Sequence, residues 1–231
     1  MTDKKNNEIM FTSNKEINKK LLLFRNFLLD YNKHTNLTAI TNLNEFNQKH
    51  LQDALKFFDI AILKNKSILD IGSGGGIPGL VFAIVEPTCK VTMVDSNNKK
   101  TKFLEAAISF LNLTNAFVIN DRIENLKKEL TAQFDFVTAR AVAPTNILLE
   151  LGAFACKIKG KIILYKGNNA LKELPINYDI VEKELGIKFE KQYIYFLENN
   201  LERNLLIFKK FQKTNLKYPR LYAQIKKNPL Y

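Results

Sequence analysis

A glycine-rich segment provides the clearest candidate ligand site in this sequence. The stretch "SILDIGSGGGIPG", from Ser67 to Gly79, places five glycines within eight residues, directly after a short apolar run. Glycine allows the backbone to approach a ligand closely. Two acidic residues accompany the loop: Asp70 lies two residues before the first glycine, and Asp95 ends the next apolar run. The pattern predicts a small-molecule site where strands end.

Three kinds of ligand are compatible with such a loop. A nucleoside triphosphate loop requires a lysine and a hydroxyl residue after its last glycine, but Leu80 and Val81 follow Gly79. The dinucleotide pattern G-x-G-x-x-G is present, and Asp95 stands where a ribose-binding acid belongs. Asp70 would oppose a pyrophosphate but attract a cation. S-adenosylmethionine carries an ammonium and a sulfonium, so the loop favours this cofactor. A tight turn that binds nothing remains the alternative.

The elements that position this loop alternate between short β-rich runs and amphipathic stretches. The strand-like runs cover residues 67–71, 90–95, 116–120, 134–139 and 161–166. Between two of them, apolar residues recur at helical spacing at Phe103, Leu104, Ala107, Phe110 and Leu111. This order predicts an α/β, Rossmann-like fold with a mostly parallel central sheet and helices on both faces.

The two ends of the chain differ from this middle. Residues 14–59 contain two amphipathic helical segments separated by "TNLTAITN", and "KQYIYFLEN" and "RNLLIFKKF" predict a C-terminal antiparallel hairpin. No repeat or Gly/Ser linker divides the chain. We therefore expect one domain over residues 1–231. It comprises an N-terminal helical cap (1–62), a Rossmann-like core (63–212) and a basic tail (213–231).

Composition limits the classes of function. The 231-residue chain carries 35 Lys and Arg against 23 Asp and Glu, a net charge of +12. This excess favours a polyanionic partner, although a biased codon composition could also produce it. The first residues lack a signal peptide's apolar region, and no run of about 18 apolar residues occurs. Two cysteines with apolar neighbours predict core residues rather than disulfides or a metal site. We expect a cytoplasmic monomer with no membrane and no metal.

Several segments carry a resemblance to a known family. "LDIGSGGGIPG", "VDSNNKKTKFLE" and "FDFVTARAVAP" resemble class I methyltransferases. More narrowly, they resemble the glucose-inhibited division protein B family, which methylates N7 of a guanine in 16S ribosomal RNA. The stretches "YNKHTNLTAI", "KHLQDAL", "NDRIENL", "LYKG", "ERNLLIFKK" and "KYPR" follow the same order. After "YPR", however, relatives tend to have Pro-Gly-Thr-Pro, where this chain reads "LYAQIKKNP".

The resemblance implies S-adenosylmethionine as the cofactor, and 16S ribosomal RNA or the small ribosomal subunit as the partner. Together with the acids considered above, it implies cofactor contacts at Asp70, Gly72, Gly74, Ile77, Asp95, Ile123, Glu124 and Arg140. Ile77 and Ile123 would clamp the adenine. Arg140 could face the cofactor carboxylate, RNA phosphate or a surface carboxylate.

Guanine N7 keeps a free lone pair, so methylation requires no general base. Proximity can supply about 7–11 kcal/mol of the barrier, and a nearby carboxylate or amide would stabilise the cationic product. The candidate catalytic residues are Asn36, His50 and Asp53, with a turn-forming Asn and a salt-bridged surface pair as alternatives. The candidate RNA contacts are Lys99, Lys100, Arg122, Lys166 and Arg203.

Two other functions stay open at this stage. One is a class I methyltransferase acting on a small molecule or a protein. The other is a non-catalytic module that senses S-adenosylmethionine and binds RNA. Release of S-adenosylhomocysteine in the presence of RNA would separate the enzyme from the sensor.

Overall fold

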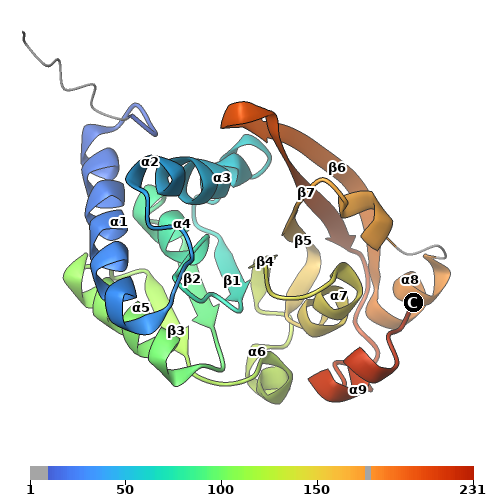
Figure 1. Ribbon diagram of the computed structural model, residues 1–231. Coiled ribbons are helices and arrows are strands. Elements are labelled where there is room, and N and C mark those ends of the chain that lie inside the picture. Colours follow the sequence, from blue (N-terminus) through green and yellow to red (C-terminus); the bar gives the residue numbers. More distant parts are fainter. Residues whose placement is uncertain (1–9, 175–177) are drawn as a thin grey trace, which may run out of the picture.

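The computed structural model describes residues 10–174 and 178–231, and Figure 1 shows one central sheet with helices on both sides. In the described part of the chain, seven strands follow the order β3-β2-β1-β4-β5-β7-β6. The strands are β1 (Ser67–Ile71), β2 (Lys90–Val94), β3 (Ala116–Ile119), β4 (Phe134–Arg140), β5 (Cys156–Lys166), β6 (Ile187–Leu197) and β7 (Leu201–Lys210). β1 to β5 pair in parallel, whereas β7 pairs antiparallel with both β5 and β6. The predicted mostly parallel sheet and C-terminal hairpin are confirmed.

The helices form two layers, one on each face of the sheet. They are α1 (Lys15–Thr35), α2 (Leu43–Phe46), α3 (Asp53–Leu55), α4 (Gly79–Val85), α5 (Asn98–Phe110), α6 (Lys127–Leu130), α7 (Thr145–Ala153), α8 (Asp179–Leu185) and α9 (Tyr222–Lys227). Side chains of α1 to α5 enter one hydrophobic core, and those of α6 to α9 enter the other. This arrangement confirms the predicted helices on both faces.

The sequence located β1 to β4 to within a residue at either end, whereas β5 and β6 begin earlier than predicted. β5 begins at Cys156, five residues before the predicted run, and its first part is a partly exposed extension with two lysines. β6 begins at Ile187, four residues before the predicted run. Phe110 differs from the other predicted apolar positions of α5, since its side chain is 50% exposed. Its ring stacks on Phe27 of α1 at 4.5 Å between centroids, so it packs at the helix pair's edge rather than in the core.

The N-terminal segment forms the two predicted helical regions, although residues 1–9 lie outside the described part. α1 packs on α4 and α5. The second region is continuous from α2 through a π-helical segment, Asn47–Gln52, into α3 and a final 3₁₀ turn, Lys56–Asp59. π-helical turns are rare and often mark functional sites. Here the turn carries His50.

The C-terminal tail is packed against the α7 face. Tyr218 and Ile225 are buried in the second core, and α9 contacts α7. Arg220 binds the fully buried carboxylate of Glu150 on α7, with its Nε 2.8 Å from Oε1 and its Nη2 2.6 Å from Oε2. The tail's atypical sequence therefore still gives an ordered helix.

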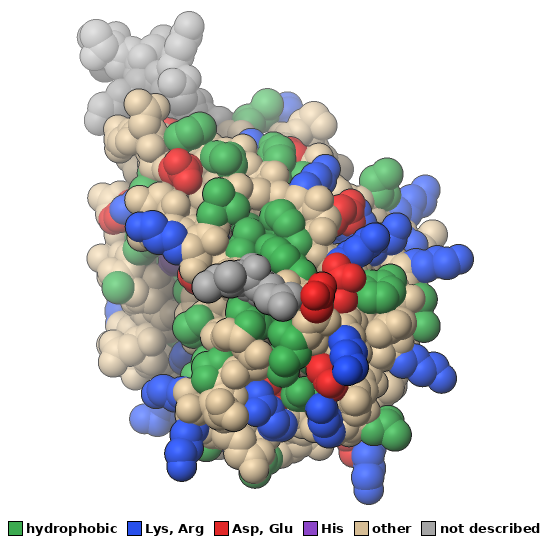
Figure 2. Space-filling view, turned by 90° about the vertical axis from the view of Figure 1, so that its right-hand side faces the viewer, with side chains coloured by type: hydrophobic (Ala, Val, Ile, Leu, Met, Phe, Trp, Pro, Cys, Tyr) green, Lys and Arg blue, Asp and Glu red, His purple; other side chains and the backbone are tan. Residues whose placement is uncertain are grey.

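The surface shows how the net charge is distributed. On the face that bears β6 and α8, lysine and arginine side chains surround a more hydrophobic central area (Figure 2). Cys89 and Cys156 are buried and unbridged, and burial raises the pKa of each thiol to about 12, as expected for core residues. Among the helices of the described residues, none is both long and apolar enough to cross a membrane.

Candidate active site

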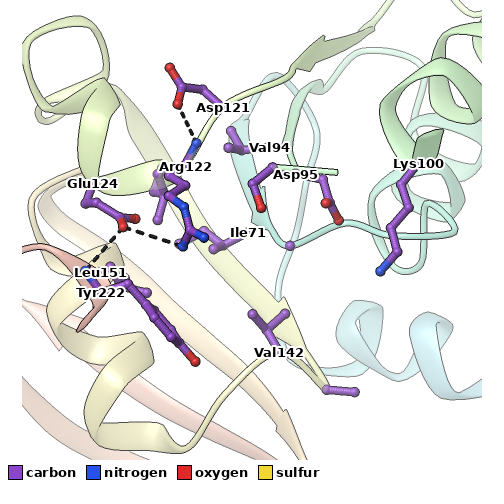
Figure 3. Close-up of a pocket in the computed structure, with 14 residues that line it drawn as sticks. Ile71, Val94, Asp95, Lys100, Asp121, Arg122, Glu124, Val142, Leu151 and Tyr222 are labelled. Carbon is purple, nitrogen blue, oxygen red and sulfur yellow. Dashed lines mark hydrogen bonds and ion pairs between the residues drawn. The ribbon is translucent and has the colours of Figure 1, made fainter. Parts of the chain in front are cut away.

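A pocket of about 320 Å³ opens where the parallel strands end (Figure 3). The sheet order reverses direction at β1 and β4, the point where open α/β sheets bind ligands. The segments that follow four of the strands line the pocket. They contribute Gly72 after β1, Asp95 and Lys100 after β2, Ile123 and Glu124 after β3, and Ala141 and Val142 after β4. Residues from distant parts of the sequence thus meet in one cavity.

The glycine loop has a conformation that requires glycine. Gly72 has a φ of +67°, and a Cβ built on it would lie 2.5 Å from Cγ2 of Val142. Gly74 has a φ of +54°, and its backbone N–H donates to Oδ2 of Asp95 at 2.9 Å. The loop after β1 is therefore fixed against the end of β2, with bare backbone beside the cavity.

Asp70 lies beneath the loop and is 1% exposed. Its Oδ2 accepts the Gly79 N–H at 3.1 Å, whereas its Oδ1 has no hydrogen-bond partner among the described residues. Burial raises the pKa of the Asp70 carboxyl to about 7, although hydrogen bonds from Ser73 and Gly79 oppose the rise. A buried acceptor without a partner is suited to a cationic or hydrogen-donating ligand group.

Asp95 ends the second strand as expected for a ribose-binding acid. Its Oδ1 accepts the Asn97 N–H at 2.8 Å, and its Oδ2 accepts the Gly74 N–H. A carboxylate can accept about four hydrogen bonds, so each oxygen retains capacity for a hydroxyl group of a ligand. The two backbone donors hold the carboxylate in place at the pocket.

Ile123 and Glu124 line the far side of the same pocket, as the resemblance implied. The Glu124 side chain is buried, and its Oε1 accepts the backbone N–H of Tyr222 at 3.2 Å. Ile77 lies elsewhere: its side chain packs against the core beside α1, α4 and α5 and does not line the pocket. Ile77 and Ile123 therefore do not face each other across this cavity.

A second pocket of about 560 Å³ shares Ala141 and Val142 with the first. Asp53, Arg140, Lys166, Glu173 and Arg203 also line it. Arg140 thus faces this second pocket and not the first, where a cofactor carboxylate would lie. The two cavities are neighbours separated by the turn after β4.

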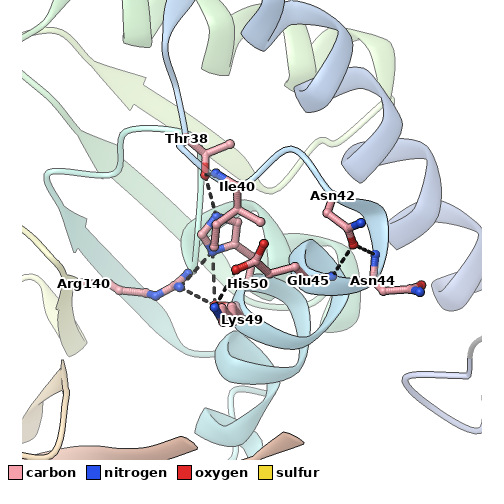
Figure 4. A network of polar contacts seen from close by, with 8 residues as sticks. All are labelled: Thr38, Ile40, Asn42, Asn44, Glu45, Lys49, His50 and Arg140. Carbon is pink, nitrogen blue, oxygen red and sulfur yellow. Dashed lines mark hydrogen bonds and ion pairs between the residues drawn. The ribbon is translucent and has the colours of Figure 1, made fainter. Parts of the chain in front are cut away.

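Three groups of the N-terminal segment hold the Arg140 guanidinium. Its Nε lies 2.9 Å from Oδ2 of Asp53, and its Nη2 donates to the Lys49 carbonyl at 2.5 Å. Nη2 also lies 2.9 Å from Nδ1 of His50, as Figure 4 shows. Nδ1 also lies 3.1 Å from the Lys49 carbonyl oxygen, and Nε2 lies 2.8 Å from Oγ1 of Thr38, so both ring nitrogens have polar partners.

His50 is consequently a neutral and fully engaged ring. Burial, and next the Arg140 charge, lower the pKa of His50 to about 4. His50 and Asp53 meet at Arg140, as their spacing on one helix face predicted. Asn36 lies apart from them: it caps the end of α1 in a left-handed conformation and lines a different hollow beside Asn32.

Asp53 is 2% exposed rather than a surface carboxylate. Its Oδ1 accepts the Tyr195 hydroxyl at 2.6 Å, and its Oδ2 accepts from Arg140. The Tyr195 pKa is raised, first by burial and then by the Asp53 charge. The alternative of a salt-bridged surface pair is therefore wrong about the surface: Asp53 is in an ion pair with Arg140, but this pair is buried.

The candidate RNA contacts fall into different environments. Lys99 is exposed, whereas Lys100 and Arg122 line the first pocket and Lys166 and Arg203 the second. The Lys166 ammonium binds Oε2 of Glu173 at 2.6 Å and the Ala143 carbonyl at 3.0 Å. Lys166 therefore braces the turn after β4. Among the described residues, no group of three or more His, Cys, Asp or Glu could hold a metal ion.

Sequence reasoning did not find Val142, Tyr195 or Tyr222. Val142 lies in "TARAVAP", two residues after Arg140. Its position beside the glycine loop depends on strand pairing. Tyr195 and Tyr222 come from the hairpin and the tail, more than a hundred residues after Asp53 and close to a hundred after Glu124 in sequence. No local pattern signals such contacts.

The fold is similar to that of solved structures. The structure is similar to TYW2 from M. jannaschii in complex with AdoMet (TM-score 0.55, 17% identity, covering 72% of this chain and 77% of that one). It is also similar to YcgJ from Bacillus subtilis (TM-score 0.56, 14% identity, 71% and 100% covered). At these identities the likeness shows the fold, which is that of the class I methyltransferases.

Sequence comparison identifies the family within this class. The family model "GidB: rRNA small subunit methyltransferase G" matches residues 17–206. A ribosomal RNA small subunit methyltransferase G from Mycoplasma capricolum is 42% identical over 219 residues, covering 94% of this chain and 93% of the relative. One from Thermotoga neapolitana is 39% identical over 199 residues, covering 86% of each chain. The chain belongs to the rRNA small subunit methyltransferase G family.

Proposed function

We propose that this protein transfers a methyl group from S-adenosylmethionine to N7 of a guanine in 16S ribosomal RNA. Family membership supports the reaction class and the ribosomal substrate. The observation that carries the proposal for the site is that two pockets share the Ala141–Val142 turn. A methyl donor in one pocket and a base in the other would approach each other at this turn.

The residues of the first pocket fit the cofactor in charge and shape. Bound there, the cofactor would supply an electrophilic methyl group on a sulfonium. Asp70 does not line the pocket itself but lies beneath its glycine loop, where its Oδ1 lacks a partner among the described residues, and Gly72 leaves backbone bare at the cavity. Asp95 would hold the ribose hydroxyls. Ile123 and Glu124 line the side that remains for the purine.

The residues of the second pocket fit a guanine. Guanine has acceptors at O6 and N7 on one edge and N–H donors on the other. Arg140 can donate to O6, which leaves the N7 lone pair free to attack the methyl group, and Asp53 and Glu173 carry the carboxylates that line the pocket. A carboxylate also stabilises positive charge as it develops on the methylated base. His50, neutral and engaged at both nitrogens, is not required as a base.

The RNA substrate must expose the target base. N7 is inaccessible in the deep, narrow groove of A-form RNA, so the guanine must lie in a loop or be extruded from its stack. The positive surface attracts the phosphate backbone. We also propose that the protein acts as a monomer and that it acts in the cytoplasm.

The test is mass mapping of modified guanines in 16S ribosomal RNA from cells with and without this gene. One N7-methylguanine should disappear in the deletion strain, and purified protein with S-adenosylmethionine should restore it in the isolated RNA or subunit. An unchanged guanine map, or turnover only on a small molecule or a protein, would contradict the proposal. Cofactor binding with no S-adenosylhomocysteine released in the presence of RNA would indicate a sensor.

A further inference from the structure

The C-terminal tail contributes a side chain to the cofactor pocket. Tyr222, the first residue of α9, lines this pocket together with Glu124 and Leu151. Its backbone N–H donates to Oε1 of Glu124 at 3.2 Å, so helix and pocket wall are joined directly (Figure 3). Tyr222 lies in "LYAQIKKNP", the stretch in which this chain departs from the resembling family.

The tail is anchored on both sides of Tyr222. Two residues earlier, Arg220 forms three hydrogen bonds to the buried Glu150 carboxylate through its backbone N, Nε and Nη2. Three residues later, Ile225 is fully buried in the core beside α7. Because both anchors rest on the body of the fold, the position of Tyr222 is set by the folded tail and not by a loose end.

The wall of the pocket that contains Tyr222 is suited to one part of the cofactor. The glycine loop and Asp70 suit the charged amino acid portion, and Asp95 suits the ribose. Figure 3 shows Tyr222, Leu151 and Glu124 on one side of Asp95, and Lys100 on the other. The purine therefore falls to the wall that contains Tyr222. An aromatic ring favours the flat face of a purine.

We propose that Tyr222 is a cofactor-binding residue whose ring packs against the adenine, so that the tail of this chain completes the cofactor pocket. The aromatic ring carries the contact, while the hydroxyl group is dispensable. The inference concerns cofactor binding alone and is independent of which base or RNA the enzyme methylates.

Fluorescence provides a direct test, because the chain contains no tryptophan. A Tyr222→Trp variant has a single reporter at the proposed contact, and Leu216→Trp, at a residue of the same tail that is 85% exposed, is the matched control. Saturating adenosine or S-adenosylhomocysteine should change the emission of Tyr222→Trp and leave that of Leu216→Trp unchanged. Methionine alone should change neither. A Tyr222→Trp variant that binds S-adenosylhomocysteine by calorimetry without a change in emission would overturn the proposal.

Affinity distinguishes ring contact from mere support of the fold. Tyr222→Ala should weaken binding of adenosine and of S-adenosylhomocysteine by a similar factor, about 5-fold or more, the scale of one lost base–aromatic contact. Tyr222→Phe should bind both like the parent protein, because it keeps the ring. Equal affinity in Tyr222→Ala, or a loss in Tyr222→Phe as large as in Tyr222→Ala, would refute ring packing. Thermal unfolding of each variant verifies that the tail is folded.

Discussion

At Asp70, burial opposes ionisation of the carboxyl group, and we expect cofactor binding to depend on pH as a result. The folded pKa of about 7 lies above the ordinary value of 3.8, so between these values the folded protein holds a proton that the unfolded chain releases. Raising the pH through this window therefore lowers the free energy of unfolding of the ligand-free protein, by up to about 1.4 kcal/mol per pH unit. A cationic ligand prefers the ionised form. We expect its affinity to rise as the pH increases towards and past 7.

Calorimetry of S-adenosylmethionine binding from about pH 6 to about pH 8 checks this expectation. Asp70→Asn, which cannot ionise, should bind more weakly and show little change with pH. A parent protein whose affinity does not vary with pH would show that Asp70 does not face the ligand's cationic part.

Asp70 and Asp95 together give an expectation about which of the two nucleotide cofactors binds, because Asp70 would oppose a pyrophosphate and Asp95 is placed to hold a ribose. We expect S-adenosylmethionine to bind and NAD not to bind. Asp95→Ala should weaken binding by about 1–3 kcal/mol, because a charge-assisted contact to the ribose is lost together with the brace on Gly74. Calorimetry with both ligands measures this difference. Tight binding of NAD, or an Asp95→Ala variant of unchanged affinity, would reject the assignment.

Asp53 and His50 both contact Arg140, but only Asp53 is a charged partner of its guanidinium. Asp53→Ala leaves the Arg140 charge and the Tyr195 hydroxyl without their buried acceptor, so the free energy of unfolding should fall by about 3–5 kcal/mol. The conservative Asp53→Asn variant isolates chemistry, and we expect it to slow methyl transfer roughly 10-fold or more. Urea unfolding and single-turnover rates with saturating substrates measure the two effects.

His50→Gln is the matched variant for that experiment. With a pKa of about 4, His50 stays neutral through the physiological range, and N7 has no proton to give up. The variant should therefore keep substantial single-turnover activity. A complete loss of transfer in a folded His50→Gln protein would require a proton-transfer role after all.

At the scale of elements, the tail and α7 act as one unit. Arg220→Ala would leave the Glu150 carboxylate buried without its cation, so we expect a loss of about 3–5 kcal/mol in the free energy of unfolding. Cofactor affinity should fall as well, because α9 would no longer be held at the pocket. Lys226→Ala, an exposed change on α9, is the control and should alter neither. Denaturant unfolding measures the stability and calorimetry the cofactor affinity. If Arg220→Ala behaved like the control in both, Arg220 would not hold the tail in place.

At the scale of the whole molecule, the net charge of +12 should govern RNA binding. Affinity should fall steeply with added salt, and the log–log slope should become shallower by about one unit for each phosphate contact removed. Lys99→Ala and Arg203→Ala are the test variants. Lys100 is less suitable because it lines the cofactor pocket. Filter binding over a salt series measures the slope, and an unchanged slope in both variants would assign these residues to surface solvation.

The sequence alone determined most of the architecture and part of the candidate cofactor site. Alternating apolar runs and helical periodicities are local properties, and they located β1 to β4 to within a residue at either end. The glycine loop, Asp70 and Asp95 were identifiable because strand-end position and glycine conformation are readable along the chain. Cys89 and Cys156 were identified as core residues from their apolar neighbours.

The tertiary structure decided which residues share a cavity. Arg140 follows the fourth strand, yet only the packing of the π-helical segment against that strand gives it Asp53 and His50 and turns it towards the second pocket. Likewise, Tyr222 reaches the cofactor pocket because Arg220 is bound by a carboxylate on a distant helix. Such contacts depend on side-chain burial and charge pairing between segments far apart in the chain. No local pattern encodes them, whereas strand and helix periodicity is encoded locally.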